Sequence, residues 1–166
     1  MRTLNDLGLF ILRLGIGVIM IVHGWDKLFV KGPTGVAGFF GSLDMPQPEL
    51  FAWIATLTEL FGGLALVIGL LTRLASLGIG LVIGGAIYYV HAANGFFNTD
   101  GGYEYQLLLC AASAALLFTG AGRWSLDQML FGRNKKDTTV DSSSTTVTYS
   151  TQPQAQTTDI PATPTQ

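Results

Sequence analysis

Four long apolar segments, each with at least one ionisable residue inside it, constrain this chain more than any other feature. They cover residues 6–29, 50–71, 74–93 and 103–120. A helix needs about 20 residues to cross the hydrocarbon core of a bilayer, and each segment is close to that length. The sequence therefore predicts an all-α fold, an integral membrane four-helix bundle.

The composition excludes a water-soluble protein. Of the 166 residues, 49% are hydrophobic and only 12% are charged, whereas soluble domains carry roughly 25% charged residues. A net charge of −2 excludes a basic surface that would bind nucleic acid. The hydrophobic composition makes the lipid bilayer the expected partner. Cys110 is the only cysteine, which excludes an internal disulfide and a cysteine-based metal cage, and we expect no metal site.

The connections between the segments differ in kind. Thr72 and Arg73 alone join the second and third segments, which predicts a tight helical hairpin. The connection after the first segment contains the apolar stretch Val36–Leu43. We expect an interfacial re-entrant or amphipathic helical segment there, with Phe39 and Phe40 at the headgroup boundary.

Positive charges predict the orientation in the membrane. Lys27 and Lys31 lie on one side, and six basic residues lie on the other: Arg2, Arg73, Arg123, Arg133, Lys135 and Lys136. The excess of positive charge marks the cytoplasmic side. We therefore expect a multi-pass protein of the plasma (inner) membrane with both termini in the cytoplasm.

The composition changes abruptly after the fourth segment. Thr, Ser, Gln and Pro make up 21 of the 30 residues 137–166, and such a segment cannot bury enough apolar surface to offset its ordering entropy. We expect a transmembrane domain over residues 1–133 and a disordered Thr/Ser/Pro/Gln-rich cytoplasmic tail over 134–166. A short amphipathic helix over 125–131 is expected before the tail, along the inner membrane surface.

Ionisable side chains at membrane depth are the candidate functional residues. Each costs roughly 2.5–3.5 kcal/mol to insert, so it faces the bundle interior or water and is paired. The candidates for ligand binding or proton relay come from all four helices: Arg13, His23, Glu59, His91 and Glu104. A rise of 1.5 Å per residue places all but Arg13 in the middle or outer half, so a polar pocket is expected there. No catalytic residue is identified.

Small residues indicate that these groups point inward, because small side chains belong at close helix–helix contacts. Three ionisable residues share a helical face with small residues: His91 with Gly80 and Gly84, Glu59 with Gly63, and Glu104 with Ala111 and Ala115.

Structural roles remain open for several of these residues. Asp26 and Lys27 are typical of an interfacial anchor at the end of a membrane helix. Arg13 is the cation nearest in depth to Glu59, so the two could form an ion pair between the first and second helices.

The outer residues have structural alternatives too. Glu104 could cap its helix, because an acidic residue in the first turn interacts favourably with the helix dipole. His91 could be a hydrogen-bonded interfacial residue. His23 and His91 could also ligate a haem, although nothing in the sequence determines their separation.

Taken in order, the motifs of this chain resemble those of the DoxX family of small four-helix membrane proteins. The resemblance covers residues 7–130 and leaves out the tail. It rests on eight short motifs: LRLGIG (12–17), HGWDKL (23–28), GFF (38–40), TELFGG (58–63), GLLTR (69–73), HAANGFF (91–97), GGYEY (101–105) and GAGRWSLD (120–127).

The resemblance implies a link to quinone- and thiol-related redox processes, as a subunit of a membrane oxidoreductase complex. The leading hypothesis is an accessory subunit whose polar pocket holds a quinone or a similar small lipophile. The sequence contains no haem, flavin or nicotinamide motif, so no intrinsic cofactor is expected. The alternative is a non-enzymatic membrane module that binds a lipid, transports a small solute or acts as a scaffold.

Overall fold

The computed structural model describes residues 2–131, and this part of the chain is helical without any strand. Three helical runs within it are long and apolar enough to cross a membrane: Thr3–Val30, Pro48–Ile68 and Thr72–Asn94. The fourth apolar helix, α6 (Glu104–Thr119), has 16 residues and is therefore about 24 Å long. The all-α membrane bundle is confirmed, while the predicted tail over 134–166 lies outside the described residues.

The first run continues directly into the predicted short helix. The run consists of α1 (Arg2–Trp25) and the π-helical turn η1 (Asp26–Val30). The short helix α2 (Gly32–Ser42) follows after Lys31. Val36 and Ala37 of α2 form a small buried cluster with Ala52, so α2 folds back against the second run. The short helix after helix one is confirmed.

The second and third runs form the predicted hairpin. The second contains α3 (Pro48–Leu57), the π-helical turn η2 (Thr58–Gly62) and α4 (Gly63–Ile68), and the third contains α5 (Thr72–Ala86) and the π-helical turn η3 (Ile87–His91). The turn lies at residues 69–71 rather than at Thr72 and Arg73, because Gly69 ends α4 in the left-handed conformation (φ 73°).

A loop with two 3₁₀ turns, η4 (Ala92–Asn94) and η5 (Asn98–Asp100), leads into α6. After α6 the chain turns and ends its described part in α7 (Leu126–Phe131). The short helix expected over 125–131 is therefore present.

Glycines bring α1 against the second run, backbone to backbone. A Cβ atom added to Gly63 would lie 2.8 Å from the carbonyl oxygen of Gly17, and one added to Gly24 would lie 2.5 Å from the nitrogen of Leu60. The close contact between helices that Gly63 predicted on the face of Glu59 is therefore present. The main core lies between these helices and the α5–α6 pair, and its buried side chains are Ile16, Met20, Leu66, Ile79, Ile83, Leu109 and Leu116.

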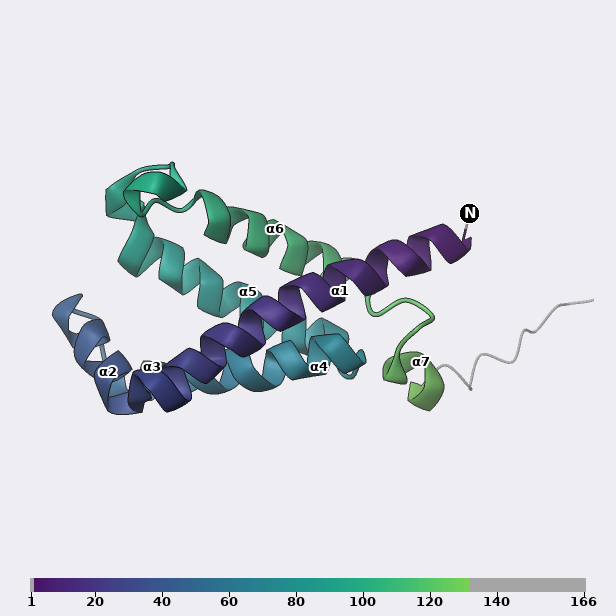
Figure 1. Ribbon diagram of the computed structural model, residues 1–166, viewed down its shortest axis with the longest axis horizontal. Helices are drawn as coiled ribbons and strands as arrows, with labels where there is room; N and C mark the ends of the chain where they lie inside the picture. Colours follow the sequence, from purple (N-terminus) through teal and green to yellow (C-terminus); the bar gives the residue numbers. More distant parts are fainter. Residues whose placement is uncertain (1, 132–166) are drawn as a thin grey trace, which may run out of the picture. The chain divides into compact units, whose positions relative to one another are not determined.

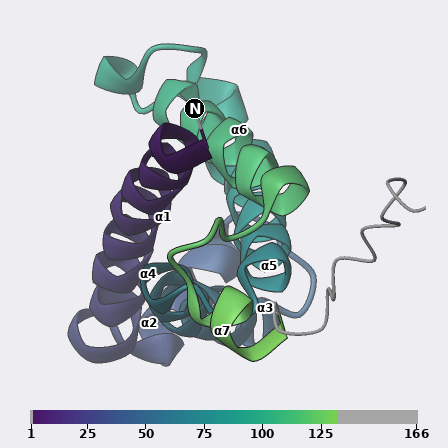
Figure 2. The same ribbon diagram turned by 90° about the vertical axis from the view of Figure 1, so that its right-hand side faces the viewer.

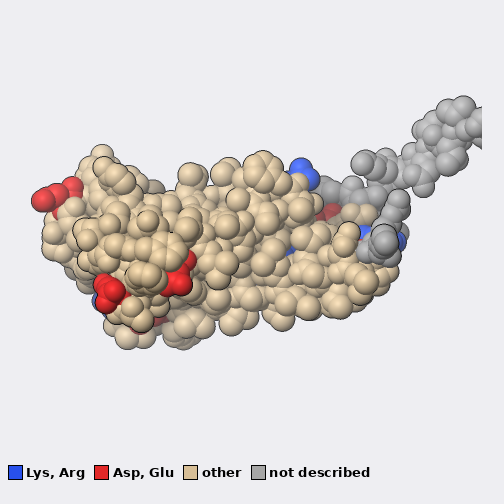
Figure 3. All heavy atoms as spheres, turned by 90° about the horizontal axis from the view of Figure 1, so that it is seen from above, with Lys and Arg blue, Asp and Glu red and all other residues tan. Residues whose placement is uncertain are grey.

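The helices diverge towards the end that carries η3. There α3 packs against α2, whereas α5 packs along α6 and contacts the second run through η2 and α4. Figure 1 shows α5 and α6 rising away from α2 and α3, and Figure 2 shows α1 on one side with α5 and α6 on the other. On the face drawn in Figure 3, a long stretch with few charged atoms separates the two ends, as expected for a surface that faces lipid.

Candidate functional site

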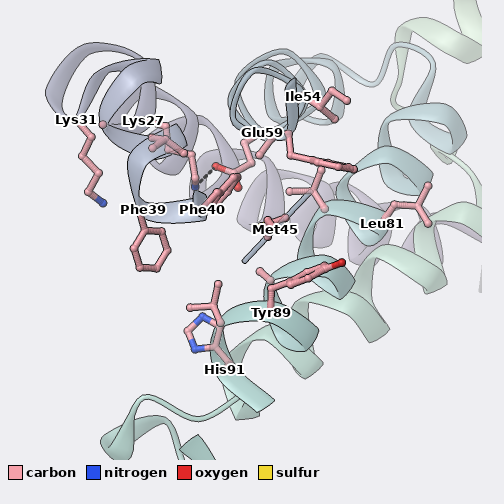
Figure 4. A pocket seen from close by; sticks show the side chains of 18 residues that line it. Lys27, Lys31, Phe39, Phe40, Met45, Ile54, Glu59, Leu81, Tyr89 and His91 are labelled. Carbon is pink, nitrogen blue, oxygen red and sulfur yellow. Dashed lines mark hydrogen bonds and ion pairs between the residues drawn. The ribbon is translucent and has the colours of Figure 1, made fainter. Parts of the chain in front are cut away.

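A pocket of about 850 Å³ lies between the diverging helices. Its walls are largely apolar and come mainly from α2, α3, α5 and η3, and they include the aromatic side chains Phe39, Phe40, Phe51 and Tyr89 (Figure 4). Pockets of this size with a few polar groups among apolar walls are typical of small-molecule sites.

Three ionisable residues of the pocket come from the three π-helical turns, and a fourth, Lys31, follows the first turn directly. Lys27 lies in η1, Glu59 in η2 and His91 in η3, and all three residues line the pocket. Such turns are rare and occur frequently at functional sites, because the extra residue changes the direction of the side chains within the turn. The three turns therefore aim polar side chains from separate helices at one cavity.

Glu59 forms an ion pair with Lys27 in this pocket. The Lys27 Nζ lies 2.5 Å from Glu59 Oε2, and the two side chains are 20% and 9% exposed. Pairing is required for charges at this depth of burial. In the part of the chain that the structure describes, Glu59 Oε1 accepts no hydrogen bond and Lys27 donates only this one, so the pair can still bond a ligand.

The structure contradicts the ion pair considered between Arg13 and Glu59. Arg13 is 1% exposed and donates to the carbonyl oxygens of Ala121 (2.6 Å) and Trp124 (2.7 Å). It therefore ties α1 to the segment that follows α6, at the end of the bundle away from the pocket. Depth along the membrane is a poor guide to partners because it says nothing about which face of a helix a residue occupies.

Asp127 completes the same end of the bundle and was not singled out by the sequence. Its carboxylate accepts hydrogen bonds from the backbone N–H groups of Leu71 (2.6 Å) and Thr72 (2.9 Å). Asp127 thereby caps the N-terminus of α5 from a distant segment. The motif over 120–127 has a structural explanation in these contacts.

Both ring nitrogens of His91 are bonded to protein. Nδ1 lies 2.7 Å from the carbonyl oxygen of Gly101, and Nε2 lies 2.9 Å from Gln106 Nε2. A carbonyl oxygen only accepts, so Nδ1 carries the proton and Nε2 accepts from the Gln106 amide in the neutral ring. His91 is thus the hydrogen-bonded residue considered above, although its ring also lines the pocket.

Asp26 and Lys27, the residues considered as an interfacial anchor, have different ion-pair partners. Asp26 pairs with Lys31 (2.6 Å), and these two side chains are 36% and 63% exposed. Lys27 turns instead towards Glu59. Lys31 lines the rim of the pocket, and its exposed pair adds little to stability.

His23 and Glu104 do not line the pocket. Both are exposed, and the Glu104 carboxylate accepts a hydrogen bond from the N–H of Asn98 (3.2 Å). Ala111 and Ala115 are exposed as well, so the inward direction predicted for the Glu104 face is wrong. The buried face of α6 instead contains Leu109, Ser113 and Leu116.

The glycines of α5 differ in how closely they pack, and a Cβ atom on Gly78 would lie 3.2 Å from Cγ2 of Thr58. A Cβ atom on Gly80 would lie 3.9 Å from that of Ser113, and the Gly80 carbonyl accepts a weak hydrogen bond from Cys110. A Cβ atom on Gly84 would have no neighbour within 4 Å. At Gly80 the predicted contact is therefore an ordinary van der Waals contact with α6, and at Gly84 it is absent.

The chain is similar to known membrane proteins. The family model described as DoxX matches residues 8–92. "Putative oxidoreductase CatD" of Bacillus subtilis is 33% identical over 130 residues, which cover 78% of this chain and 92% of that protein. "Inner membrane protein YqjF" of Escherichia coli is 29% identical over 140 residues, covering 82% and 99%. "Uncharacterized membrane protein Rv3486" of Mycobacterium tuberculosis is 28% identical over 132 residues, covering 74% and 80%. No solved structure matches the chain significantly.

Proposed function

Because the chain belongs to the DoxX family of membrane proteins, we propose that it is an accessory subunit in a membrane redox process. Its pocket holds a quinone, and a partner oxidoreductase complex supplies the electrons. The partner is needed because this sequence has no flavin or nicotinamide motif and only one cysteine. The name of the Bacillus subtilis relative supports a redox context for this family.

The Lys27–Glu59 pair at the bottom of an apolar pocket is the observation that carries the proposal. A quinone ring presents two carbonyl acceptors, and the reduced ring presents two hydroxyl donors. The ammonium of Lys27 can donate to a carbonyl, and Glu59 Oε1 can accept from a hydroxyl. Phe39, Phe40 and Tyr89 offer flat surfaces for the ring.

The test is the quinone content of protein purified in mild detergent from its native membrane. We expect a quinone in the organic extract of the wild type and its loss from Glu59→Gln, because the amide weakens both the ion pair and the acceptor. Glu104→Gln makes the same chemical change outside the pocket and should retain the quinone. An extract without quinone, from a protein whose spectrum is featureless above the aromatic band, would contradict the proposal.

One observation favours the non-enzymatic alternative, a module that binds lipid. His91 has both ring nitrogens occupied by protein, so it offers no unbonded nitrogen for proton transfer at the pocket. If the same extract contains phospholipid enriched over the surrounding membrane and no quinone, the lipid-binding function replaces the redox one.

A further inference from the structure

On the side of α3 and α5 the pocket changes from polar to apolar between its bottom and its rim, whereas Lys31 lies on the rim away from Ile54 and Leu81 (Figure 4). Glu59, at the bottom, is 7% exposed, whereas Ile54 and Leu81, at the rim, are 43% and 69% exposed. Exposing large apolar side chains to water costs free energy, whereas exposing them to hydrocarbon does not. The chemistry of the rim is therefore that of an opening towards lipid.

The position of the rim along the membrane helices agrees with its chemistry. Leu81 is the tenth residue of the span Thr72–Asn94, which has 23 residues, and Glu59 is the twelfth of the 21 residues of Pro48–Ile68. Both residues thus lie near the middle of their spans. Figure 4 shows Ile54 and Leu81 on different helices, and both line the same pocket as Glu59 and Met45.

We propose that the pocket is entered sideways from the bilayer, between α3 and α5. The ligand is a chain-bearing amphiphile whose polar head contacts Lys27 and Glu59 and whose hydrocarbon chain leaves between Ile54 and Leu81. The inference rests on the proposed function for the nature of the head, a quinone ring, and adds the chain and the route of entry.

A glycine on α5 keeps this route open. Gly85 lies one helical turn from both Leu81 and Tyr89, and all three residues line the pocket. A Cβ atom added at Gly85 would meet no heavy atom within 4 Å. A larger side chain there would fill the route without disturbing the packing of the helices.

Gly84 provides a matched control for this position. A Cβ atom on Gly84 also meets nothing within 4 Å, but Gly84 does not line the pocket. Gly84→Leu and Gly85→Leu therefore add the same side chain to the same helix, and only the second places it in the route of the chain.

The experiment measures the binding of two benzoquinones with the same ring, one with a decyl chain and one without, to protein in lipid nanodiscs. Gly85→Leu should weaken binding of the decyl compound by about tenfold or more, the size of an overpacking effect, and leave the chainless compound within about twofold. Gly84→Leu should leave both unchanged. Equal effects of the two variants, or equal losses of both compounds in Gly85→Leu, would overturn sideways entry and leave the proposed function intact.

If the wild type binds neither quinone, the proposed function is refuted. The route into the pocket can then still be tested by a measurement that needs no ligand. A nitroxide is attached through Ala86→Cys, which lies in the pocket wall, in a Cys110→Ser background. Its relaxation should respond more to oxygen, which concentrates in the bilayer, than to a water-soluble nickel chelate. A stronger response to the nickel chelate would show an opening to water and overturn the inference.

Discussion

At the scale of single residues, one cation balances the buried carboxylate of Glu59. Lys27 belongs to the first helical run and lies near its end. Its ammonium nitrogen lies 2.5 Å from a carboxylate oxygen of Glu59. Removing one partner of a buried pair leaves an uncompensated charge, whereas replacing both partners by apolar groups is often tolerated. Variants that remove one partner and variants that replace both partners should therefore differ in stability.

We expect Lys27→Met to lower the free energy of unfolding in detergent by about 3 kcal/mol. Adding Glu59→Met should recover part of that loss, because no unpaired charge remains. Thermal unfolding of the two single variants and the double variant measures the coupling. Lys31→Met removes the exposed pair with Asp26 and should have little effect; strictly additive single effects would show that Lys27 and Glu59 do not interact.

At the scale of helices, glycines determine how closely α1 meets the second run. A Cβ atom at Gly24 would overlap the backbone of Leu60, and backbone atoms cannot move aside as the end of a flexible side chain can. Gly15, on the same helix, has no heavy atom near the place of a Cβ atom. The first glycine is required by packing, and the second is not.

Gly24→Ala should therefore destabilise the protein by about 1–3 kcal/mol through overpacking. Gly15→Ala should be neutral or stabilise by about 0.5–1 kcal/mol, because alanine is the better helix former. The measurement is the melting temperature of each variant in the same detergent. Similar melting temperatures for the two variants would mean that α1 does not contact η2 as closely as described.

At the scale of the whole bundle, the beginning of α1 and the segment after α6 lie at the same end. The Asp6 carboxylate accepts a hydrogen bond from the N–H of Arg123 (3.1 Å), and Arg13 bonds the same segment. Figure 1 shows the N-terminus and α7 at this end. The chain thus returns to the side from which it starts, as an even number of membrane crossings requires.

The excess of positive charge predicts that this side is the cytoplasm. In a Cys110→Ser background, a membrane-impermeant thiol reagent applied to intact cells should label Thr99→Cys, in the outer loop. It should not label Ser143→Cys until the membrane is permeabilised. Labelling of Ser143→Cys in intact cells with protection of Thr99→Cys would reverse the orientation.

The number of apolar helices, their approximate bounds and the short helix after the first one could be predicted from the sequence alone. These are local properties: the length and hydropathy of a segment decide whether it crosses a bilayer. The depth of Glu59 was predictable for the same reason, and its inward direction followed from the cost of exposing a carboxyl group to lipid.

The contacts between side chains of different helices could not be predicted in this way. Glu59 pairs with Lys27 rather than Arg13, and Glu104 faces outward although small residues share its helical face. Partners depend on the rotation of each helix about its axis and on the π-helical turns, which redirect the side chains within them. Neither is visible in hydropathy, because rotation and side-chain direction are set by the contacts between helices and not by the composition of any one of them.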